Sequence, residues 1–573
     1  MASKNKFTVE KLNILSSGLH ILKYVALFVF SALFLLVFSL WTSPFYKNWY
    51  GCDASFFTMA GRGILNGWVP YRDFFDLKGP YFFFIEALGQ FLCTGRTGAY
   101  IIQIFALFFT LVLMIKTCRM FISAKKTGFI VTIFLAFHAA TLWGGNTLEE
   151  YMLPLSLLSI YLVLRDMKAY QRTLKISNNS NQLLNSSVHT NNIVINNGVI
   201  EDLSVIRSST ALIVGLCFGV ILFSKITVAA PIIGLVLAII VTYIRAKRYY
   251  NLFEFLLFAF LGVLLSITPI FIYFYLHNML TDMLYAVFIF AFKRSIDFGT
   301  KFNLRWELKI SGCYFAIIFV ICQIWPRGFI QSARNAFKSA FIRLHNIKAR
   351  QQVRDIKPVS SVKSNTKLNT ESRSFMLTII FCIALITAIV LHFGDPFIYY
   401  FTTVYPTLML TFICMFTLYD PVILFRSWRL DVPLVAFLIT MSYFASHTAT
   451  QLNTIIYDRG NIYYQHYVDS AREMASLIPY NERGDVYSFN MDMQWFECNN
   501  ILPCYTYTIN LQFFVALDPR IEENILEKLN AAPPKWLVVG GDLSSYLPNI
   551  NNVVVKKYEN IYENGYGALY ILK

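Results

Sequence analysis

Charged residues are scarce in this chain of 573 residues. They make up 14% of it, whereas hydrophobic residues make up 56%, and an ordinary soluble domain is about 25% charged. This composition excludes a single soluble globular core, because the apolar surface exceeds what a water-soluble fold can hide. The class that remains is a polytopic membrane protein, for which the bilayer is the solvent.

Motifs for binding nucleotides or metals are also missing. The sequence holds no Gly-Lys-Ser/Thr segment, no strand is expected before Gly61-x-Gly63, and the eight histidines form no ligand spacing. A nucleotide-binding fold is therefore not indicated.

Acidic residues are few in the first 450 positions. Positions 451–573 hold nine Lys/Arg and fourteen Asp/Glu, a net charge of −5, so the total of +16 leaves +21 on the first 450 residues. This basic excess does not require a nucleic acid, because a chain that spans lipid collects Lys and Arg on its cytoplasmic loops. We expect the lipid bilayer as the partner of this part, and no nucleic acid.

Long apolar stretches predict about eleven transmembrane helices. They lie at about 20–41, 98–118, 127–143, 151–164, 209–224, 226–244, 252–276, 309–325, 374–392, 397–418 and 432–448. With the N-terminus in the cytoplasm, the loops on that side are rich in Lys or Arg, and the loop 327–373 alone has eleven basic and two acidic residues. The positive-inside rule thus predicts a multi-pass cell-membrane protein with an uncleaved first span. Its C-terminal region is then extracytoplasmic.

The polar C-terminal region predicts a small extracytoplasmic α/β domain at 451–573, after a transmembrane domain at 1–450. Strands are expected at Asp485–Phe489, Trp536–Gly540, Asn552–Tyr558 and Ala568–Leu572, and a helix at Arg520–Asn530. Most of the ten cysteines lie in spans and are expected to be buried. Cys498 and Cys504, six positions apart in the outer domain, leave two alternatives open, a local disulfide or two free thiols.

The external loop 42–80 combines charges with turn residues. A helix is expected from Asp53 to about Asn66-Gly67, and Pro70 and Gly79-Pro80 then restrict the chain. Rigid charge beside lipid usually indicates function. The alternative is structural: Asp53 caps the helix, and the other charges of the loop pair with one another at the headgroup level. Those other charges are Arg72, Asp73, Asp76 and Lys78.

An acidic residue, a helix and the motif G-x-x-P-Y-x-D-x-x-D-x-K-G-P at 67–80 follow the first span. This arrangement resembles the first external loop of polyprenyl-phosphate-dependent glycosyltransferases of the type C (GT-C) fold, a group with protein O-mannosyltransferases and the aminoarabinose transferase of lipid A. The resemblance covers most of the membrane region. It implies that Asp53 is the catalytic carboxylate and that Lys78 contacts the donor phosphate. Two positions depart from the family: Ala54 replaces a frequent second acid, and Lys78-Gly79-Pro80 replaces Lys-Pro-Pro.

Elementary chemistry agrees with these roles. Moving a sugar from a lipid phosphate to a hydroxyl requires a base for the hydroxyl proton, and a carboxylate at Asp53 can serve. Cations must stabilise the leaving phosphate, and Lys78 is on the same loop. The neighbouring Arg72, Asp73 and Asp76 are further candidates for the donor-phosphate site.

A second phosphate cation is implied in another outer loop. The resemblance points to Lys293 or Arg294 there, close to Lys301 in sequence. The alternative is that these residues bind lipid headgroups at the interface. A lone Lys225 between two spans is either a substrate residue or, as we expect, a snorkelling cation.

The second outer loop, 144–151, resembles the family's second acidic site, which orients an acceptor or a metal. Thr147-x-x-Glu150 also matches a capping box, which gives Glu150 a structural explanation, whereas Glu149 has none. A divalent Mg or Mn ion, if the protein uses one, would fall to Asp53 and Glu149. The segment 399–406 resembles a Tyr-containing segment of the family, so Tyr400 either contacts sugar or anchors at the interface.

Together these patterns predict an integral-membrane, inverting glycosyltransferase. It would move a sugar from a polyprenyl-phosphate donor to a cell-envelope acceptor, which is a glycan, lipid or protein, on the outer face. One alternative is an envelope-polysaccharide polymerase or ligase, which would need a large external loop where 393–396 is very short. Another is a lipid-linked sugar flippase or transporter, which predicts internal repeats that the sequence does not show.

Overall fold

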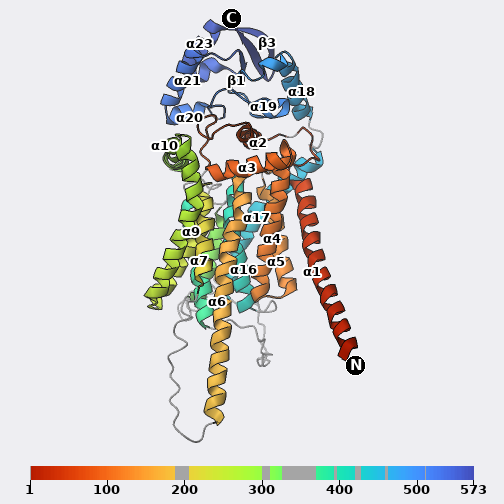
Figure 1. Ribbon diagram of the computed structural model, residues 1–573, viewed down its shortest axis with the longest axis vertical. Helices are drawn as coiled ribbons and strands as arrows, with labels where there is room; N and C mark the ends of the chain where they lie inside the picture. Colours follow the sequence, from red (N-terminus) through yellow and green to blue (C-terminus); the bar gives the residue numbers. More distant parts are fainter. Residues whose placement is uncertain are drawn as a thin grey trace, which may run out of the picture.

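The computed structural model describes residues 2–48, 50–142, 144–187, 206–299, 310–324, 370–392, 397–419, 428–457, 462–509 and 511–573. Long helices form a bundle, and a smaller unit that contains the C-terminus sits on one end of it (Figure 1). We call this end the domain side. Lys301 and most of the basic segment 327–373 lie outside the described residues.

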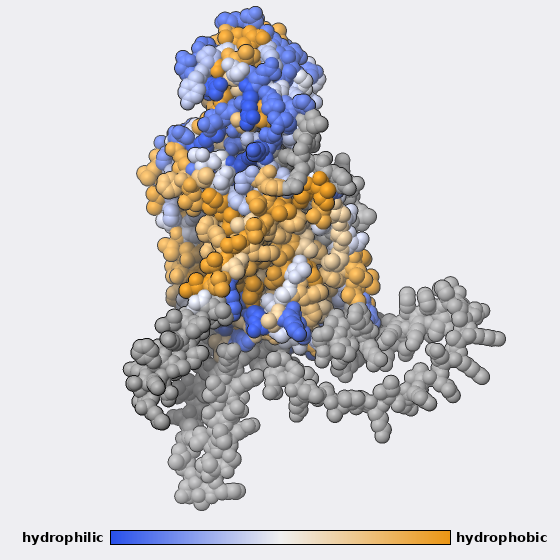
Figure 2. All heavy atoms as spheres, turned by 90° about the vertical axis from the view of Figure 1, so that its right-hand side faces the viewer, coloured by the Kyte–Doolittle hydropathy of each residue, from blue (hydrophilic) through white to orange (hydrophobic). Residues whose placement is uncertain are grey.

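Each of the eleven predicted spans coincides with a helix. These helices are α1 (Ala2–Phe38), α4 (Arg96–Phe121), α5 (Ala124–Thr141), α6 (Leu148–Ser187), α7 (Ser208–Leu222), α8 (Ala230–Arg245), α9 (Tyr249–Leu276), α13 (Ser311–Ile324), α15 (Thr370–His392), α16 (Tyr405–Leu418) and α17 (Trp428–Tyr457). Among the described residues, seven helical segments are long and apolar enough to cross a membrane, and α7 and α13 are shorter apolar helices. Figure 2 shows an apolar band across the visible face of the bundle and a largely hydrophilic unit above it. The helical membrane class is therefore confirmed.

Small residues allow the helices to pack closely. A Cβ atom at Gly215 of α7 would lie 1.9 Å from the Ala259 carbonyl oxygen of α9, and one at Gly262 would lie 2.1 Å from the Leu212 oxygen. Such close backbone approach is typical of helices that associate in lipid. By contrast, the apolar windows of α1, α9 and α17 are only 11%, 22% and 12% buried, so most of their surface is left to face lipid.

Two short helices lie on the domain side, between the bundle and the C-terminal unit (Figure 1). They are α2 (Cys52–Leu65) and α3 (Pro80–Leu92). The predicted helix is confirmed in α2, which ends at Asn66 and is followed by Gly67 with a positive φ of 91°. Phenylalanines of α2, α3 and the connection between them are fully buried beneath, namely Phe56, Phe57, Phe74, Phe82 and Phe83. This apolar layer fixes loop 42–80 to the bundle.

The third outer segment and two short 3₁₀ helices complete the membrane part. The third outer segment consists of α10 (Leu280–Leu284), η2 (Tyr285–Phe290) and α11 (Ala291–Gly299), and the 3₁₀ helices are η1 (Ile226–Ala229) and η3 (Ile398–Val404). A third 3₁₀ helix, η5 (Tyr480–Glu482), belongs to the C-terminal unit.

The C-terminal unit is the predicted α/β domain. Its elements are α18 (Ile462–Ser476), β1 (Val486–Phe489), α19 (Gln494–Asn499), α20 (Leu511–Leu517), α21 (Arg520–Ala531), β2 (Trp536–Val539), α22 (Leu543–Tyr546), α23 (Pro548–Lys557), β3 (Tyr558–Asn564) and β4 (Gly567–Leu572). The sheet order is β1-β2-β4-β3, with β1 parallel to β2 and the other pairs antiparallel. Helix α17 runs past position 450 to Tyr457, so the domain's own elements begin at α18.

One predicted strand is wrong. Residues 552–557 belong to α23, and the strand β3 begins only at Tyr558. Pro548 stands in the first turn, where its fixed φ favours a helix start. Ile550 and Val554, four positions apart, are the buried residues of this helix. The run of valines therefore reflects one buried helical face and not an extended chain.

Candidate functional site

Asp53 lies in the first turn of α2 and is half-buried. The N-cap of the helix is Gly51, and no side chain caps it. Asp53 is thus not the N-cap that the structural alternative required. The first turn of a helix is a favourable place for a negative charge, because the N-terminal end of the helix dipole is positive.

A second acid, which the sequence did not reveal, faces this turn from the C-terminal domain. Asp492 precedes α19 and accepts hydrogen bonds from the Gln494 backbone N (3.0 Å) and Nε2 (2.8 Å). Burial raises the pKa of Asp492, and the charge of Asp53 nearby raises it further. A carboxylate from a distant segment thus stands near Asp53.

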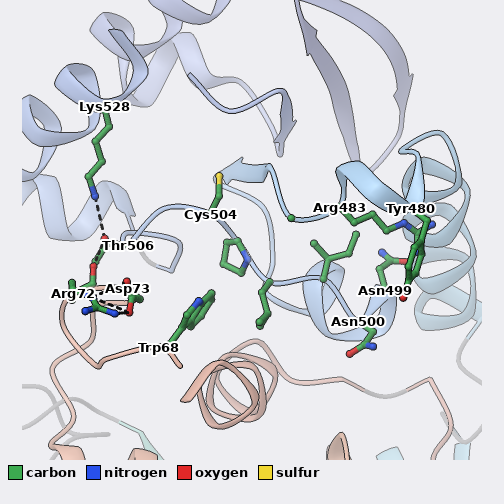
Figure 3. Close-up of a pocket in the computed structure, with 14 residues that line it drawn as sticks. Trp68, Arg72, Asp73, Tyr480, Arg483, Asn499, Asn500, Cys504, Thr506 and Lys528 are labelled. Carbon is green, nitrogen blue, oxygen red and sulfur yellow. Dashed lines mark hydrogen bonds and ion pairs between the residues drawn. The ribbon is translucent and has the colours of Figure 1, made fainter. Parts of the chain in front are cut away.

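The other charges of the loop form two ion pairs. Arg72 Nη2 lies 2.7 Å from Asp73 Oδ2, and Lys78 Nζ lies 3.1 Å from Asp76 Oδ2. The two pairs differ in burial, since the Arg72 side chain is 50% exposed and that of Lys78 is 18% exposed. Solvent screens the first pair. It borders a cavity that faces the C-terminal domain (Figure 3).

Lys78 is held from several directions. Its ammonium lies 4.5 Å from the centre of the Phe57 ring, and its carbonyl accepts a hydrogen bond from the Tyr71 hydroxyl at 2.8 Å. Tyr71 itself has a positive φ of 71°. The loop conformation therefore directs the charge of Lys78 toward the bundle.

Glu149 and Tyr400, which come from separate loops, both contact Lys225, for which the sequence predicted a snorkelling position at the lipid interface. Lys225 Nζ lies 2.7 Å from Glu149 Oε1 and 4.0 Å from the centre of the Tyr400 ring. The Lys225 side chain is 18% exposed, and Glu149 is buried. The snorkelling interpretation of Lys225 is therefore wrong, because its charge turns to a buried carboxylate and an aromatic face.

Backbone hydrogen bonds join the Lys78 loop to the Lys225 turn. The Gly79 N–H donates to the Ser224 carbonyl at 2.7 Å, and the Tyr81 N–H donates to the Phe223 carbonyl at 3.4 Å. A Cβ atom at Gly79 would lie 2.0 Å from the Phe223 oxygen. Gly79, which stands where the family has proline, thus permits this contact. The contact places the backbones of Lys78 and Lys225 side by side.

Glu150 has the structural role that its capping-box spacing indicated. Its Oε1 accepts from Thr147 N (3.2 Å) and Oγ1 (2.7 Å), and its Oε2 accepts from Gln103 Nε2 (2.7 Å). Gln103 also accepts from Ser39 and Thr42 of the loop after α1. This buried network fixes the start of α6 and hence the position of the adjacent Glu149.

Glu86 of α3 was missed, because its only sequence signal is a single acid in an apolar helix. It is 1% exposed, and neither carboxyl oxygen has a hydrogen-bond partner of good geometry among the described residues. Burial raises the pKa of Glu86 to about 8, so the group is largely protonated at neutral pH. Gly61 of α2 packs on the Glu86 backbone. The largely protonated Glu86 therefore packs against α2, the helix that carries Asp53.

The predicted cations of the third outer segment contact aromatic rings. Lys293 Nζ is 5.7 Å from the Tyr285 ring centre, and the Arg294 guanidinium is 5.0 Å from that of Phe513 in α20. Both contacts lie near the junction with the C-terminal domain. Of the cations considered, Lys225 is the one that backbone hydrogen bonds join to the Lys78 loop.

The disulfide alternative for Cys498 and Cys504 is not realised, and both are free thiols. Cys498 lies in the last turn of α19 with its thiol 3.5 Å from the Trp495 carbonyl, and Asn500 then reverses the chain with φ 55°. The backbone N–H of Cys504 donates to the Val486 carbonyl beside β1.

The acidic residues do not assemble a metal site. Within the described parts of the chain, no group of three or more His, Cys, Asp or Glu side chains could hold an ion. Glu149 is engaged by Lys225, which a divalent cation would have to displace. The proposed pair of Asp53 and Glu149 is thus not supported as a Mg or Mn site by this geometry.

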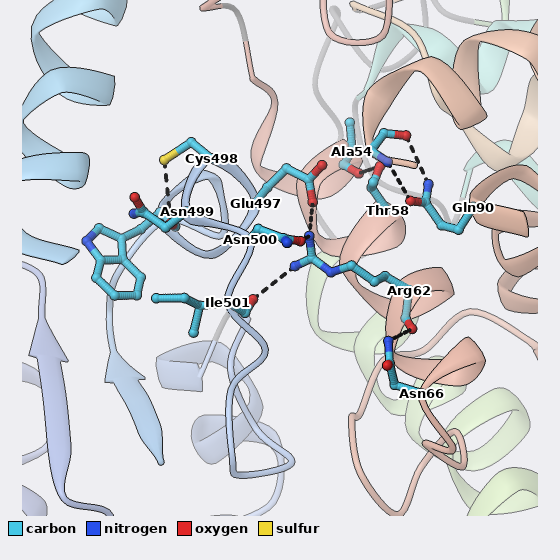
Figure 4. A network of polar contacts seen from close by, with 12 residues as sticks. Ala54, Thr58, Arg62, Asn66, Gln90, Glu497, Cys498, Asn499, Asn500 and Ile501 are labelled. Carbon is cyan, nitrogen blue, oxygen red and sulfur yellow. Dashed lines mark hydrogen bonds and ion pairs between the residues drawn. The ribbon is translucent and has the colours of Figure 1, made fainter. Parts of the chain in front are cut away.

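The C-terminal domain is attached to loop 42–80 at two places. Figure 4 shows Arg62 of α2 reaching Glu497, Asn500 and the Ile501 carbonyl, with distances of 3.7, 2.5 and 3.0 Å. Arg72 and Phe75 make the second attachment, through the Thr506 hydroxyl to the Arg72 carbonyl (2.7 Å) and the Phe75 N–H to the Thr506 carbonyl (3.1 Å). The loop is thereby held between the bundle and the domain.

Comparison with known proteins identifies the fold. No family model and no curated protein matches the sequence. The structure of ArnT from Cupriavidus metallidurans bound to undecaprenyl phosphate matches with a TM-score of 0.52 and 14% identity, over 96% of this chain and 98% of that one. Its apo structure gives a TM-score of 0.49 at the same identity and coverage. An Archaeoglobus fulgidus oligosaccharyltransferase in complex with zinc and sulfate gives 0.42 at 12% identity, over 95% and 73%.

The first match extends over nearly the whole of both chains. ArnT is a glycosyltransferase of the type C fold, so the predicted GT-C fold is confirmed. At this identity the likeness establishes the fold and leaves the activity to the site.

Proposed function

We propose that the protein is a membrane glycosyltransferase that moves a sugar from a polyprenyl-phosphate donor to a cell-envelope acceptor. The reaction would take place on the domain side, which we assign to the outer face of the cell membrane. The observation that carries this proposal is the junction of two lysines, Lys78 and Lys225, with the Asp53 loop. The fold supports it, because the ArnT structure of the same fold is bound to undecaprenyl phosphate.

Asp53 is the base in this proposal. The acceptor hydroxyl attacks the anomeric carbon from the face opposite the phosphate, its proton passes to Asp53, and the sugar–phosphate bond breaks with inversion. The carboxylate stands half-buried in the first turn of α2, as a base for this step. Asp492 of the C-terminal domain lies close enough for the charge of Asp53 to raise the pKa of Asp492.

Lys78 and Lys225 stabilise the leaving phosphate. Each ammonium is paired with one carboxylate, Asp76 or Glu149, which holds it near the junction. The donor phosphodiester carries one negative charge, and a second develops on the phosphate as the sugar–phosphate bond breaks, so its charge-assisted hydrogen bonds to both ammonium groups strengthen as the reaction proceeds. Glu149 then acts as a positioning residue for Lys225, and the Tyr400 ring beneath limits where that lysine can move.

The remaining predicted residues have supporting places. Arg72 and Asp73 border the cavity on the domain side, and Lys293 and Arg294 lie at the junction with α20. Contact of the last two with the donor phosphate stays a prediction.

The proposal is tested by incubating the purified protein with a panel of polyprenyl-phosphate sugars and envelope extract as a source of acceptor. Release of the free polyprenyl phosphate is measured. We expect release from at least one donor that is lost when Lys78 and Lys225 are both replaced by Gln. Transport of an intact lipid-linked sugar across vesicles, without cleavage, would contradict the proposal.

A further inference from the structure

A cavity of about 820 Å³ lies between loop 42–80 and the C-terminal domain (Figure 3). The loop contributes Trp68, Arg72 and Asp73 to its lining. The domain contributes residues that follow α18 and α19 and one from α21, among them Tyr480, Arg483 and Lys528. None of the roles proposed above uses this cavity.

The lining of the cavity keeps a net positive charge after the Arg72–Asp73 ion pair is set aside as neutral. Arg72 and Asp73 neutralise each other at 2.7 Å. Arg483 donates to the Ala475 carbonyl (3.1 Å), and Lys528 donates to the Thr506 hydroxyl (3.3 Å), both of which are uncharged partners. Two positive charges are therefore left to attract an anionic group.

Aromatic rings and amides accompany these charges. The Trp68 ring packs against Phe74 at 6.1 Å between centres and fills the space over Gly63, where a Cβ atom would lie 2.1 Å from it. Its orientation is thus set before a ligand binds. Tyr480 and the amides of Asn499 and Asn500 line the same cavity. Flat rings that contact C–H faces, together with amides that bond hydroxyls, are the chemistry by which proteins bind sugars.

We propose that this cavity binds an anionic oligosaccharide, as a part of the acceptor that is remote from the reacting hydroxyl. This inference rests on the proposed glycosyl transfer. Asp53 is in the first turn of α2, whereas Arg62, which bonds the cavity residue Asn500, is in the last. The helical rise separates these two positions by about 14 Å. One sugar ring cannot cover that span, so the acceptor must be a chain of several sugars.

An anionic lipid headgroup is the other source of the same charge. The lining favours the glycan, because the cavity lies against the C-terminal domain and polar groups of that domain form part of its wall. The test therefore includes both ligands.

The full-length protein in detergent is applied to arrayed uronate-, phosphate- and sulfate-bearing oligosaccharides, neutral oligosaccharides of equal length, and vesicles with anionic lipids. We expect an anionic oligosaccharide of three or more units to be retained more strongly than its neutral counterpart. Trp68→Ala and Arg483→Gln should each weaken that retention about tenfold, the effect of one good polar or aromatic contact. Tyr546→Ala and Lys556→Gln, which alter exposed residues of the same domain, are the matched controls.

Retention of no oligosaccharide, equal retention of neutral ones, or Trp68-dependent binding to vesicles alone would overturn the proposal. Asp53→Asn separates it from the proposed function, since this variant should still retain the oligosaccharide. Conversely, if the protein releases polyprenyl phosphate normally but retains no anionic oligosaccharide, this inference alone is overturned.

Discussion

The two sides of loop 42–80 carry similar charges in different surroundings. Toward the bundle, the Lys78–Asp76 pair is largely buried and hydrogen bonds join its segment to the Lys225 turn. Toward the C-terminal domain, the Arg72 and Asp73 side chains are 50% and 26% exposed, so this pair is in partial contact with solvent. Burying a charge has a high desolvation cost. A buried ion pair therefore requires a fold that holds both partners in good geometry. The two pairs therefore differ in burial, which their positions in the sequence do not reveal.

The proposed roles of both sides of loop 42–80 require that the domain side does not face the cytoplasm. A reporter that fluoresces only in the cytoplasm, fused after Lys573, should stay dark, because the positive-inside rule places this end outside. The same reporter fused at Lys6 is the positive control. Bright signal from the C-terminal fusion would put the Asp53 loop on the wrong face for the proposed transfer.

Asp53→Asn should give the largest loss of activity. It keeps the size and most hydrogen bonds of the side chain but removes the base, so transfer should fall at least about a hundredfold while donor binding is retained. Asp73→Asn, in the more exposed pair of the same loop, is the comparison variant. Because Asp73 borders the proposed acceptor cavity, both variants are compared at saturating acceptor, where Asp73→Asn should change turnover less than about threefold. Turnover and donor binding of folded proteins are the measurements. Equal effects of the two substitutions would remove the functional distinction between the sides of the loop.

Removal of either buried lysine should weaken donor binding and turnover together. A phosphate cation acts in the ground state and in the transition state, and one charge-assisted hydrogen bond corresponds to about tenfold or more. We expect this for Lys78→Gln and Lys225→Gln, but not for Arg72→Gln. Because Lys225→Gln leaves Glu149 buried without its cation, the double variant Lys225→Gln, Glu149→Gln is measured as well. If the double variant recovers donor binding fully, Lys225 serves the fold and not the phosphate.

Glu86→Gln should have a smaller effect, on stability and not on transfer. Burial raises the pKa of Glu86 from 4.5 to about 8, so the folded protein binds more protons than the unfolded one between these values. Its contribution is complete below pH 4.5 and is lost as pH rises to about 8, at up to about 1.4 kcal/mol per pH unit. Thermal unfolding across pH should show this decline in the wild type and a flatter profile in Glu86→Gln. Parallel profiles would mean that Glu86 is ionised in the folded state.

Local patterns predicted most of the fold. The eleven apolar stretches and the turn signal Asn66-Gly67 depend on neighbouring residues only, and each appears in the structure. The segment 552–558 was misassigned because a run of valines fits a strand as well as a buried helical face. Period and propensity conflict in such short runs, and tertiary packing decides.

The site was only partly predictable for the same physical reason. Glu149 and Tyr400 were identified in separate loops, but Lys225, which joins them, looked like an isolated interfacial cation. Asp492 comes from the outer domain, more than four hundred residues after Asp53, and nothing in its local sequence indicates that neighbour. Contacts between distant segments arise from packing, which a single sequence does not display.

The hydrogen bond from Gly79 to Ser224 also bears on how the protein responds to different membranes. A helix adapts to bilayer thickness by tilting, and a tilt of α7 would carry the turn at Lys225 with it. Because that turn is bonded directly to Gly79, the Lys78 segment would shift with it and the gap between the two backbones would be kept. The spacing of the Lys78 and Lys225 backbones is therefore set by this contact within the protein and not by the thickness of the lipid around it.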